Sequence, residues 1–199
     1  MCPTLCVASG ARATGDTLFR IASNTKIFTD LAAIRAVSEA GYNLDTPVVQ
    51  LESRFKVQDP FPGGLNGADI TLHHLGTHMS GLYDTAPCAR DTLGSACTTA
   101  DVFNNLPKTQ LALPVGFRPA YSNLGFSLLG SVCEPLMKMS YARYVTEKIL
   151  RPFGMNSSTF NVSDPNVVAR MAKGGGKWSK LIEMGFSNPA GGLVSSTND

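Results

Sequence analysis

Hydrophobic residues recur at helical spacing in the first quarter of the chain. Ile27, Leu31, Ile34 and Val37 follow one another at intervals of three or four, and Gly41 is a natural helix stop. We therefore predict a helix over about 23–40. The short stretch 18–22 before it is apolar and β-prone, which favours an extended segment that runs directly into the helix.

The densest run of apolar residues lies beyond the middle of the chain. It predicts a helix buried on several sides, built on Leu124, Phe126, Leu128, Leu129, Val132 and Leu136. Ser140 is placed to cap a second helix over about 141–150, with Tyr144, Val145, Ile149 and Leu150 facing inward. Pro152 and Gly154 then end that helix.

Two shorter helices are predicted between these regions. Thr71 is expected to cap the first helix, which extends to about residue 77. Thr99 is expected to cap the second helix, which extends to about residue 106 and is ended by Pro107. Proline and glycine make 42–70, 81–96 and 114–121 predominantly loop. The glycine-rich remainder after 154 offers one or two short strands, so helices outweigh strands.

Composition narrows the classes of protein without selecting one. The 199 residues are 43% hydrophobic and 16% charged with a net charge of +2, which predicts a folded, soluble chain and no nucleic-acid partner. No apolar run approaches the roughly 18 residues of a membrane helix. The first residues lack the basic head and apolar stretch of a signal peptide.

Cysteines and histidines raise two further possibilities. Cys88 and Cys97 bracket a polar loop and could form a disulfide, which, with sequons at Asn156 and Asn161, slightly favours a secretory or extracellular location. His74 and His78 would share a helical face as zinc ligands, but no third ligand is near and Gly76 weakens the helix. Structural histidines are the favoured interpretation, and no metal is predicted.

The pair Ser23 and Lys26 carries the candidate chemistry. Three residues is just under one helical turn, so the hydroxyl and the amine project from the same side. A serine hydroxyl needs a neighbouring base to act as a nucleophile, and a lysine can provide one. The N-terminal end of a helix also favours an oxyanion beside that hydroxyl. The ordinary alternative is an N-cap serine.

Ser-x-x-Lys is a short pattern, and it occurs twice here. The second copy, Ser53 and Lys56, lies among charged residues with no long apolar helix after it, so we interpret it as solvated surface. A separate segment contains Tyr121 and Asn123 just before the buried helix. Tyr121 could relay a proton from Ser23, and Asn123 could bind Lys26 or a substrate carbonyl. The alternative is a core aromatic followed by a helix cap.

Five segments together resemble the serine β-lactamase and penicillin-binding-protein family, in its class C and esterase-like branch. Residues 19–26 resemble its nucleophile segment, and 70–82 resemble its "ITLRHLLTHTSGL" stretch. The other three segments, at 114–125, 150–155 and 189–193, are similar to "PG…YSNxGY", "LxPLGM" and "PAGGL". Their order along the chain is that of the family.

The resemblance implies a β-lactamase/transpeptidase-like α+β fold, dominated by helices, and a serine hydrolase that forms an acyl-enzyme. Carried over by residue, it makes Ser23 the nucleophile, Lys26 its activator, Tyr121 the general base and acid, and Asn123 a substrate-binding residue. Implied substrates are β-lactams, peptides ending in D-alanine, or esters, and no cofactor is implied.

Two departures from the family pattern concern the sheet. No Lys- or His-[Ser/Thr]-Gly triplet follows residue 193, and only 18 residues precede Phe19, where the family has a strand hairpin. We therefore expect residues 1–199 to form one partial domain with an incomplete central antiparallel sheet, and weak or no turnover. The alternative is a non-catalytic binding or scaffold member, or an incomplete gene product, of the same family.

Overall fold

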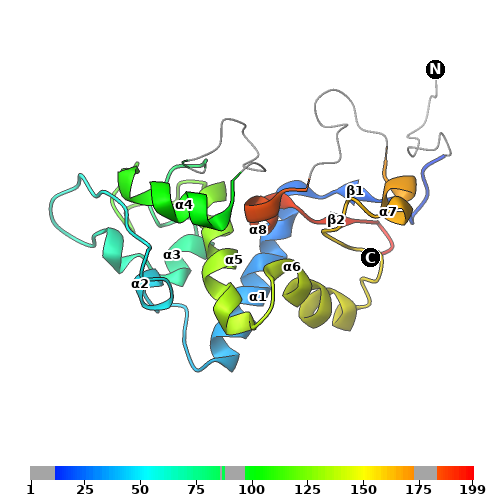
Figure 1. Ribbon diagram of the computed structural model, residues 1–199, viewed down its shortest axis with the longest axis horizontal. Coiled ribbons are helices and arrows are strands. Elements are labelled where there is room, and N and C mark those ends of the chain that lie inside the picture. The colour runs from blue at the N-terminus through cyan, green and yellow to red at the C-terminus, as the bar shows by residue number, and fades with distance from the viewer. Residues whose placement is uncertain (1–11, 86, 88–96, 173–182) are drawn as a thin grey trace, which may run out of the picture.

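The computed structural model describes residues 12–85, 87, 97–172 and 183–199. Two long helices, α1 (Thr25–Glu39) and α5 (Asn123–Met137), pack against each other at its centre (Figure 1). Shorter helices surround this pair on both sides. They are α2 (Val48–Leu51), α3 (Leu72–Gly76), α4 (Thr99–Asn105), α6 (Tyr141–Tyr144) with its π-helical continuation Val145–Leu150, α7 (Pro165–Arg170) and α8 (Asn188–Gly191).

The sheet within the described residues has two strands, β1 (Phe19–Arg20) and β2 (Val194–Ser195). They are antiparallel, with Phe19 opposite Ser195. The helix-dominated α+β prediction with an incomplete antiparallel sheet is thereby confirmed. The pairing places the end of the chain beside the segment that precedes α1, and so brings α8 next to Ser23.

Helix α1 packs through small residues rather than large ones. Ala32, Ala33 and Ala36 are buried, and they let α1 approach α5 and α8 closely. The predicted helix is confirmed, but of the apolar residues that predicted it only Val37 is buried. The other three lie on the opposite face, with exposed fractions of 61% for Ile27, 40% for Leu31 and 48% for Ile34.

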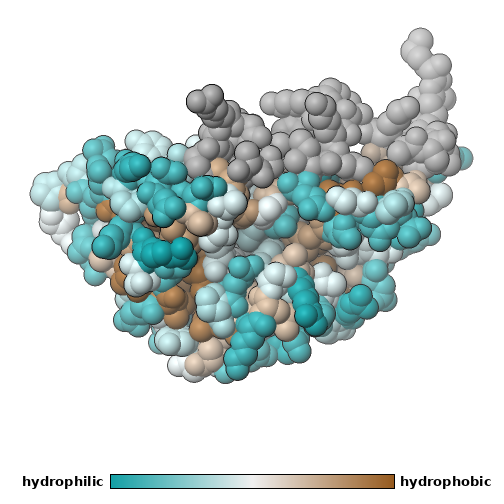
Figure 2. All heavy atoms as spheres, in the orientation of Figure 1, coloured by the Kyte–Doolittle hydropathy of each residue, from teal (hydrophilic) through white to brown (hydrophobic). Residues whose placement is uncertain are grey.

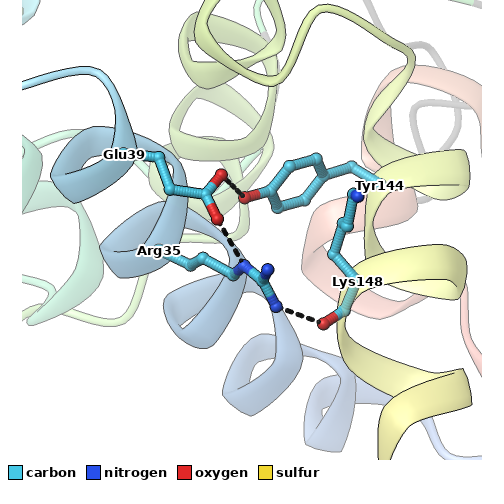
Figure 3. Close-up of polar contacts among 4 residues, drawn as sticks. All are labelled: Arg35, Glu39, Tyr144 and Lys148. Carbon is cyan, nitrogen blue, oxygen red and sulfur yellow. Dashed lines mark hydrogen bonds and ion pairs between the residues drawn. The ribbon is translucent and has the colours of Figure 1, made fainter.

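A polar cluster joins the C-terminal half of α1 to α6 and its π-helical continuation (Figure 3). Arg35 donates to the Glu39 carboxylate at 2.7 Å and to the backbone oxygen of Lys148 at 2.9 Å, and Tyr144 donates to the same carboxylate at 3.1 Å. The bond from Arg35 lowers the pKa of Glu39, while burial and that carboxylate raise the pKa of Tyr144 to about 12. The cluster adds a polar connection to the packing on this flank of α1.

Helix caps follow local hydrogen-bonding rules, with two corrections to the predictions. Thr71 caps α3 as expected, but α4 is capped by Thr98, because Asp101 three residues later completes a reciprocal capping box. Ser140 occupies the cap position of α6 without a side-chain bond. The carboxylate of Glu134 instead accepts from the Tyr141 N–H at 2.7 Å.

The surface is mixed in character. Figure 2 shows hydrophilic residues along much of one face, with hydrophobic residues visible between them. None of the helices in the described part of the chain is long and apolar enough to cross a membrane. Cys97 is buried and disulfide-bonded, and its expected partner Cys88 lies outside the described residues.

Candidate functional site

Ser23 occupies a single 3₁₀ turn, Ala22–Asn24, that leads directly into α1. The residue before it, Ala22, has a φ of 46°, a left-handed conformation that costs a residue with a side chain about 1–2 kcal/mol. Thr25 holds this turn by donating to the Ala22 carbonyl at 2.6 Å, and it accepts from the Leu193 N–H at 3.2 Å. The serine therefore lies on a constrained backbone beside the segment that leads to β2.

The hydroxyl of Ser23 has two polar partners. Its Oγ lies 2.5 Å from the Tyr121 hydroxyl and 3.2 Å from Lys26 Nζ. Tyr121 lies 98 residues after Ser23 in the sequence. Ser23 and Tyr121 are exposed, whereas Lys26 is buried, so the two hydroxyl-bearing residues lie at the surface and the amine lies beneath them.

Lys26 has a complete set of hydrogen-bond acceptors. Besides Ser23 Oγ, its Nζ donates to Asn123 Oδ1 at 2.7 Å and to the Ala190 carbonyl at 2.6 Å. Three acceptors match the three donors of an ammonium group. The Nζ atom also lies 4.8 Å from the centre of the Tyr121 ring and 5.4 Å from that of Phe126, within cation–π range.

Both ordinary alternatives for the second segment differ from the structure. Tyr121 is half exposed, so it is not a core aromatic. The cap of α5 is Ser122, whose Oγ accepts from the Gly125 N–H at 2.9 Å, and Asn123 directs its side chain to Lys26 instead. The structure thus brings Ser23, Lys26, Tyr121 and Asn123 together.

Two further residues contact these groups, and the sequence analysis did not single out either for this role. Asp84 binds Asn123, and His78 binds the same segment: its Nδ1 accepts from the Ser122 N–H at 3.1 Å and its ring centre lies 4.6 Å from that of Tyr121. Burial and the positive charge of Lys26 lower the pKa of His78, and Asp84 opposes this shift. The acceptor role of Nδ1 requires that nitrogen to be unprotonated.

The position of His78 also shows whether His74 and His78 share a helical face, as a pair of zinc ligands would require. Helix α3 ends at Gly76, and His78 follows it with a φ of 60°. Meanwhile the His74 ring lies within hydrogen-bonding distance of Thr71, at the start of the same helix. Because the helix stops between them, the two imidazoles do not share a helical face.

The second Ser-x-x-Lys copy has different surroundings. Ser53 and Lys56 follow α2 in non-helical backbone, and both are exposed. Glu52 and Arg54 next to them form an ion pair at 2.6 Å. This agrees with the interpretation of this copy as solvated surface.

Comparisons with known proteins place the chain in a family. The Beta-lactamase family model matches residues 6–199. Beta-lactamase-like protein 4 of Dictyostelium discoideum is 33% identical in an alignment 194 positions long, which covers 91% of this chain and 34% of that protein. The chain therefore spans about a third of the length of this relative.

Solved structures show the same relationship. A beta-lactamase/D-alanine carboxypeptidase from Yersinia pestis, complexed with citrate, aligns with a TM-score of 0.78 and 25% identity, over 96% of this chain and 53% of that one. A class C beta lactamase from Rhodobacter sphaeroides aligns with a TM-score of 0.75 and 24% identity, over 96% of this chain and 51% of that one. With its sequence match and its β-lactamase/transpeptidase-like fold, the chain belongs to the beta-lactamase family.

Proposed function

We propose that this chain belongs to a serine hydrolase that acts through an acyl-enzyme formed on Ser23. One observation carries the proposal: Lys26 Nζ and the Tyr121 hydroxyl both lie within hydrogen-bonding distance of Ser23 Oγ. A nucleophile within reach of two proton-handling groups is the arrangement that covalent acyl transfer requires. Membership of the beta-lactamase family supports this assignment.

The geometry assigns a role to each group in the proposed reaction. In its deprotonated form, Tyr121 accepts the proton of Ser23 as Oγ bonds to the substrate carbonyl carbon, and it then donates that proton to the leaving group. Lys26 stabilises the negative charge that develops on the two oxygens, because its Nζ lies beside both side chains. In the second half of the reaction, water attacks the ester and Tyr121 takes and returns a proton in the reverse sense.

The proposed substrates are acyl compounds with a cleavable amide or ester: β-lactams, peptides ending in D-alanine, or esters. The solved relatives are described as β-lactamases and D-alanine carboxypeptidases, which supports the first two. The Asn123 Nδ2 group has a second hydrogen beyond the one that Asp84 accepts, and this hydrogen is available to a substrate carbonyl. The chemistry assigned to these residues needs no metal or organic cofactor.

A serine-directed fluorophosphonate probe tests the proposal. We expect the chain to be labelled at Ser23, Ser23→Ala to lose labelling, and Ser53→Ala, the matched control in the second copy, to react like the parent. Peptide mapping identifies the modified residue. Labelling unchanged by Ser23→Ala would remove Ser23 from the nucleophile role and favour a non-catalytic binding or scaffold function.

Once labelling has identified Ser23, unlabelled protein allows the substrate classes to be compared. Hydrolysis of a chromogenic β-lactam is measured against that of a short-chain ester and a D-alanyl-D-alanine peptide. Turnover by the 199 residues is expected to be weak, since the third family motif was not found in them. Accumulation of the acyl-enzyme, detected by mass spectrometry, is therefore the primary measurement.

A further inference from the structure

Asp84 accepts hydrogen bonds from the residues at the start of α5 through both its side chain and its backbone. One oxygen of its carboxylate, Oδ1, accepts from the Asn123 backbone N–H at 3.0 Å and from Asn123 Nδ2 at 2.8 Å. Its backbone carbonyl accepts from the Leu124 N–H at 3.0 Å. Asp84 thus holds both the backbone and the side chain of Asn123.

These contacts determine which way the Asn123 amide points. An ionised carboxylate only accepts hydrogen bonds, so it selects the orientation in which Nδ2 faces Asp84 and Oδ1 faces away. Oδ1 is the atom that accepts from Lys26 Nζ at 2.7 Å. The reversed amide would place donors opposite the Lys26 ammonium and an oxygen opposite the carboxylate, which is unfavourable at both ends.

The segment that carries Asp84 is itself held in place. Ser122 Oγ donates to the Tyr83 carbonyl at 2.7 Å, and the Gly81 carbonyl accepts from the Ala112 N–H at 2.8 Å. Gly81 has a φ of 72°, and a side chain there would meet the Leu113 carbonyl. The backbone that leads to Asp84 is therefore held by contacts at Gly81 and Tyr83.

We propose that Asp84 is a positioning residue for the reaction: it orients the Asn123 amide so that Oδ1 holds Lys26 against Ser23. The inference rests on the proposed function, because its effect is exerted through the group that activates the nucleophile. Asp84 acts through Asn123 and is not itself within the set of groups that bind Ser23 Oγ.

The experiment compares Asp84→Asn with the parent chain and with Asp45→Asn. An asparagine at 84 is nearly the same size but carries both a donor and an acceptor, so it no longer selects one amide orientation. Asp45 is an exposed aspartate whose carboxylate accepts no hydrogen bond from the described residues, which makes it a matched control. The rate of Ser23 labelling is measured against probe concentration, and the melting temperature shows that each variant folds.

We expect Asp84→Asn to lower the limiting labelling rate about three- to tenfold, with little change in the half-saturating probe concentration. Asp45→Asn should match the parent. In an Asn123→Ala background, Asp84→Asn should cause no further loss, because the side chain through which it acts is gone. A structural role alone would lower the rate equally in both backgrounds.

Two results would overturn the inference separately from the proposed function. The positioning role is rejected, and the hydrolase proposal left intact, if the parent is labelled at Ser23 but Asp84→Asn reacts at the parent rate. An equal loss of labelling rate in both backgrounds has the same consequence. A parent that is not labelled at Ser23 would reject both. Should Asp84→Asn fail to fold, Asp84→Ala replaces it in both the parent and the Asn123→Ala backgrounds.

Discussion

The chain contains two Ser-x-x-Lys segments, and the structure gives them opposite surroundings. In the first, Lys26 is buried and its Nζ binds three oxygens, while Ser23 Oγ lies 2.5 Å from the Tyr121 hydroxyl. In the second, Ser53 and Lys56 are both exposed, in backbone that is not helical. The same spacing therefore produces a candidate reaction centre in one place and ordinary surface in the other.

The difference arises from residues that are distant in the sequence. Tyr121, Asn123 and Ala190 all reach Lys26 or Ser23 from segments about a hundred residues or more away. Next to the second copy the pairing is local instead, since Arg54 forms an ion pair with Glu52, two residues away. The Ser-x-x-Lys spacing allows the two side chains to project from the same side of a helical turn. Tertiary contacts decide whether both side chains lie in the same polar site.

The largest expected effect is that of removing the buried amine. Lys26→Met should lower the second-order rate of Ser23 labelling by about 10²–10⁴-fold, the range of a lost acid–base or charge-stabilising group. It also takes this donor away from the buried Ala190 carbonyl and the partly buried Asn123 Oδ1, which should cost about 1–3 kcal/mol of unfolding free energy. Lys56→Met should change neither quantity. Equal effects of the two substitutions would remove the distinction between the copies.

Removing the distant hydroxyl is expected to have the next largest effect. Tyr121→Phe keeps the ring beside His78 but takes away the hydroxyl that hydrogen-bonds to Ser23 and that we propose as its proton acceptor, so the labelling rate should fall about 10²-fold. Stability should change little, since the hydroxyl is in an exposed contact. Labelling at the parent rate, measured at several pH values, would show that Lys26 alone activates the serine.

The surroundings of α1 should also produce a distinctive pH dependence. Burial raises the pKa of Asp30, one turn beyond Lys26, to about 7, compared with about 3.9 for an aspartate in the unfolded chain. The folded state therefore binds this proton more tightly, and stability should fall as pH rises from about 4 to about 7.

Asp30→Asn isolates this effect. The variant should be more stable than the parent at pH 8, by about 2 kcal/mol after allowance for solvent screening, with the difference vanishing near pH 4. The pH dependence of stability due to Glu52, beside the second copy, has the opposite sign, because the hydrogen bond from Arg54 lowers the pKa of Glu52. Glu52→Gln should cost about 0–1 kcal/mol at neutral pH and less in acid. Denaturant titrations across pH test both.

A further small effect concerns the backbone just before Ser23. Ala22→Gly removes the conformational energy of a side chain at a φ of 46°, which stabilises the folded state. It also raises the conformational entropy of the unfolded chain, which opposes this gain. A net gain of about 0.5–1 kcal/mol is expected, measured as a rise in melting temperature. Ala68→Gly, at a position of negative φ, should instead be neutral or destabilising. A loss of stability in Ala22→Gly would mean that the turn tolerates the side chain without strain.

Features that depend on neighbouring residues were predicted well. The positions of α1, α3 and α5 agree with the expected helices within a few residues, because periodicity and caps are local properties. The cap of α4 was placed one residue late, since Thr98 and Thr99 differ only in whether an aspartate follows at the third position. The apolar spacing of α1 predicted the helix but not its buried face.

The supporting residues of the candidate site could not be predicted in the same way. His78 adopts a positive φ just beyond α3, and Asp84 lies in a loop whose path is set by Gly81 and by contacts with α5. No periodicity marks either residue. Their roles follow from hydrogen bonds to Ser122 and Asn123, which form only after α5 has packed against α3.

By itself the sequence determined the helical segments, the shared side of Ser23 and Lys26, and, through five ordered motifs, the family. Only the tertiary structure decided that Tyr121 meets the serine, that Asp84 holds the amide of Asn123, and that the copy at Ser53 stays in solvent. The reason is physical: backbone geometry sets spacing within one turn, whereas burial and long-range hydrogen bonds exist only once the chain has closed on itself.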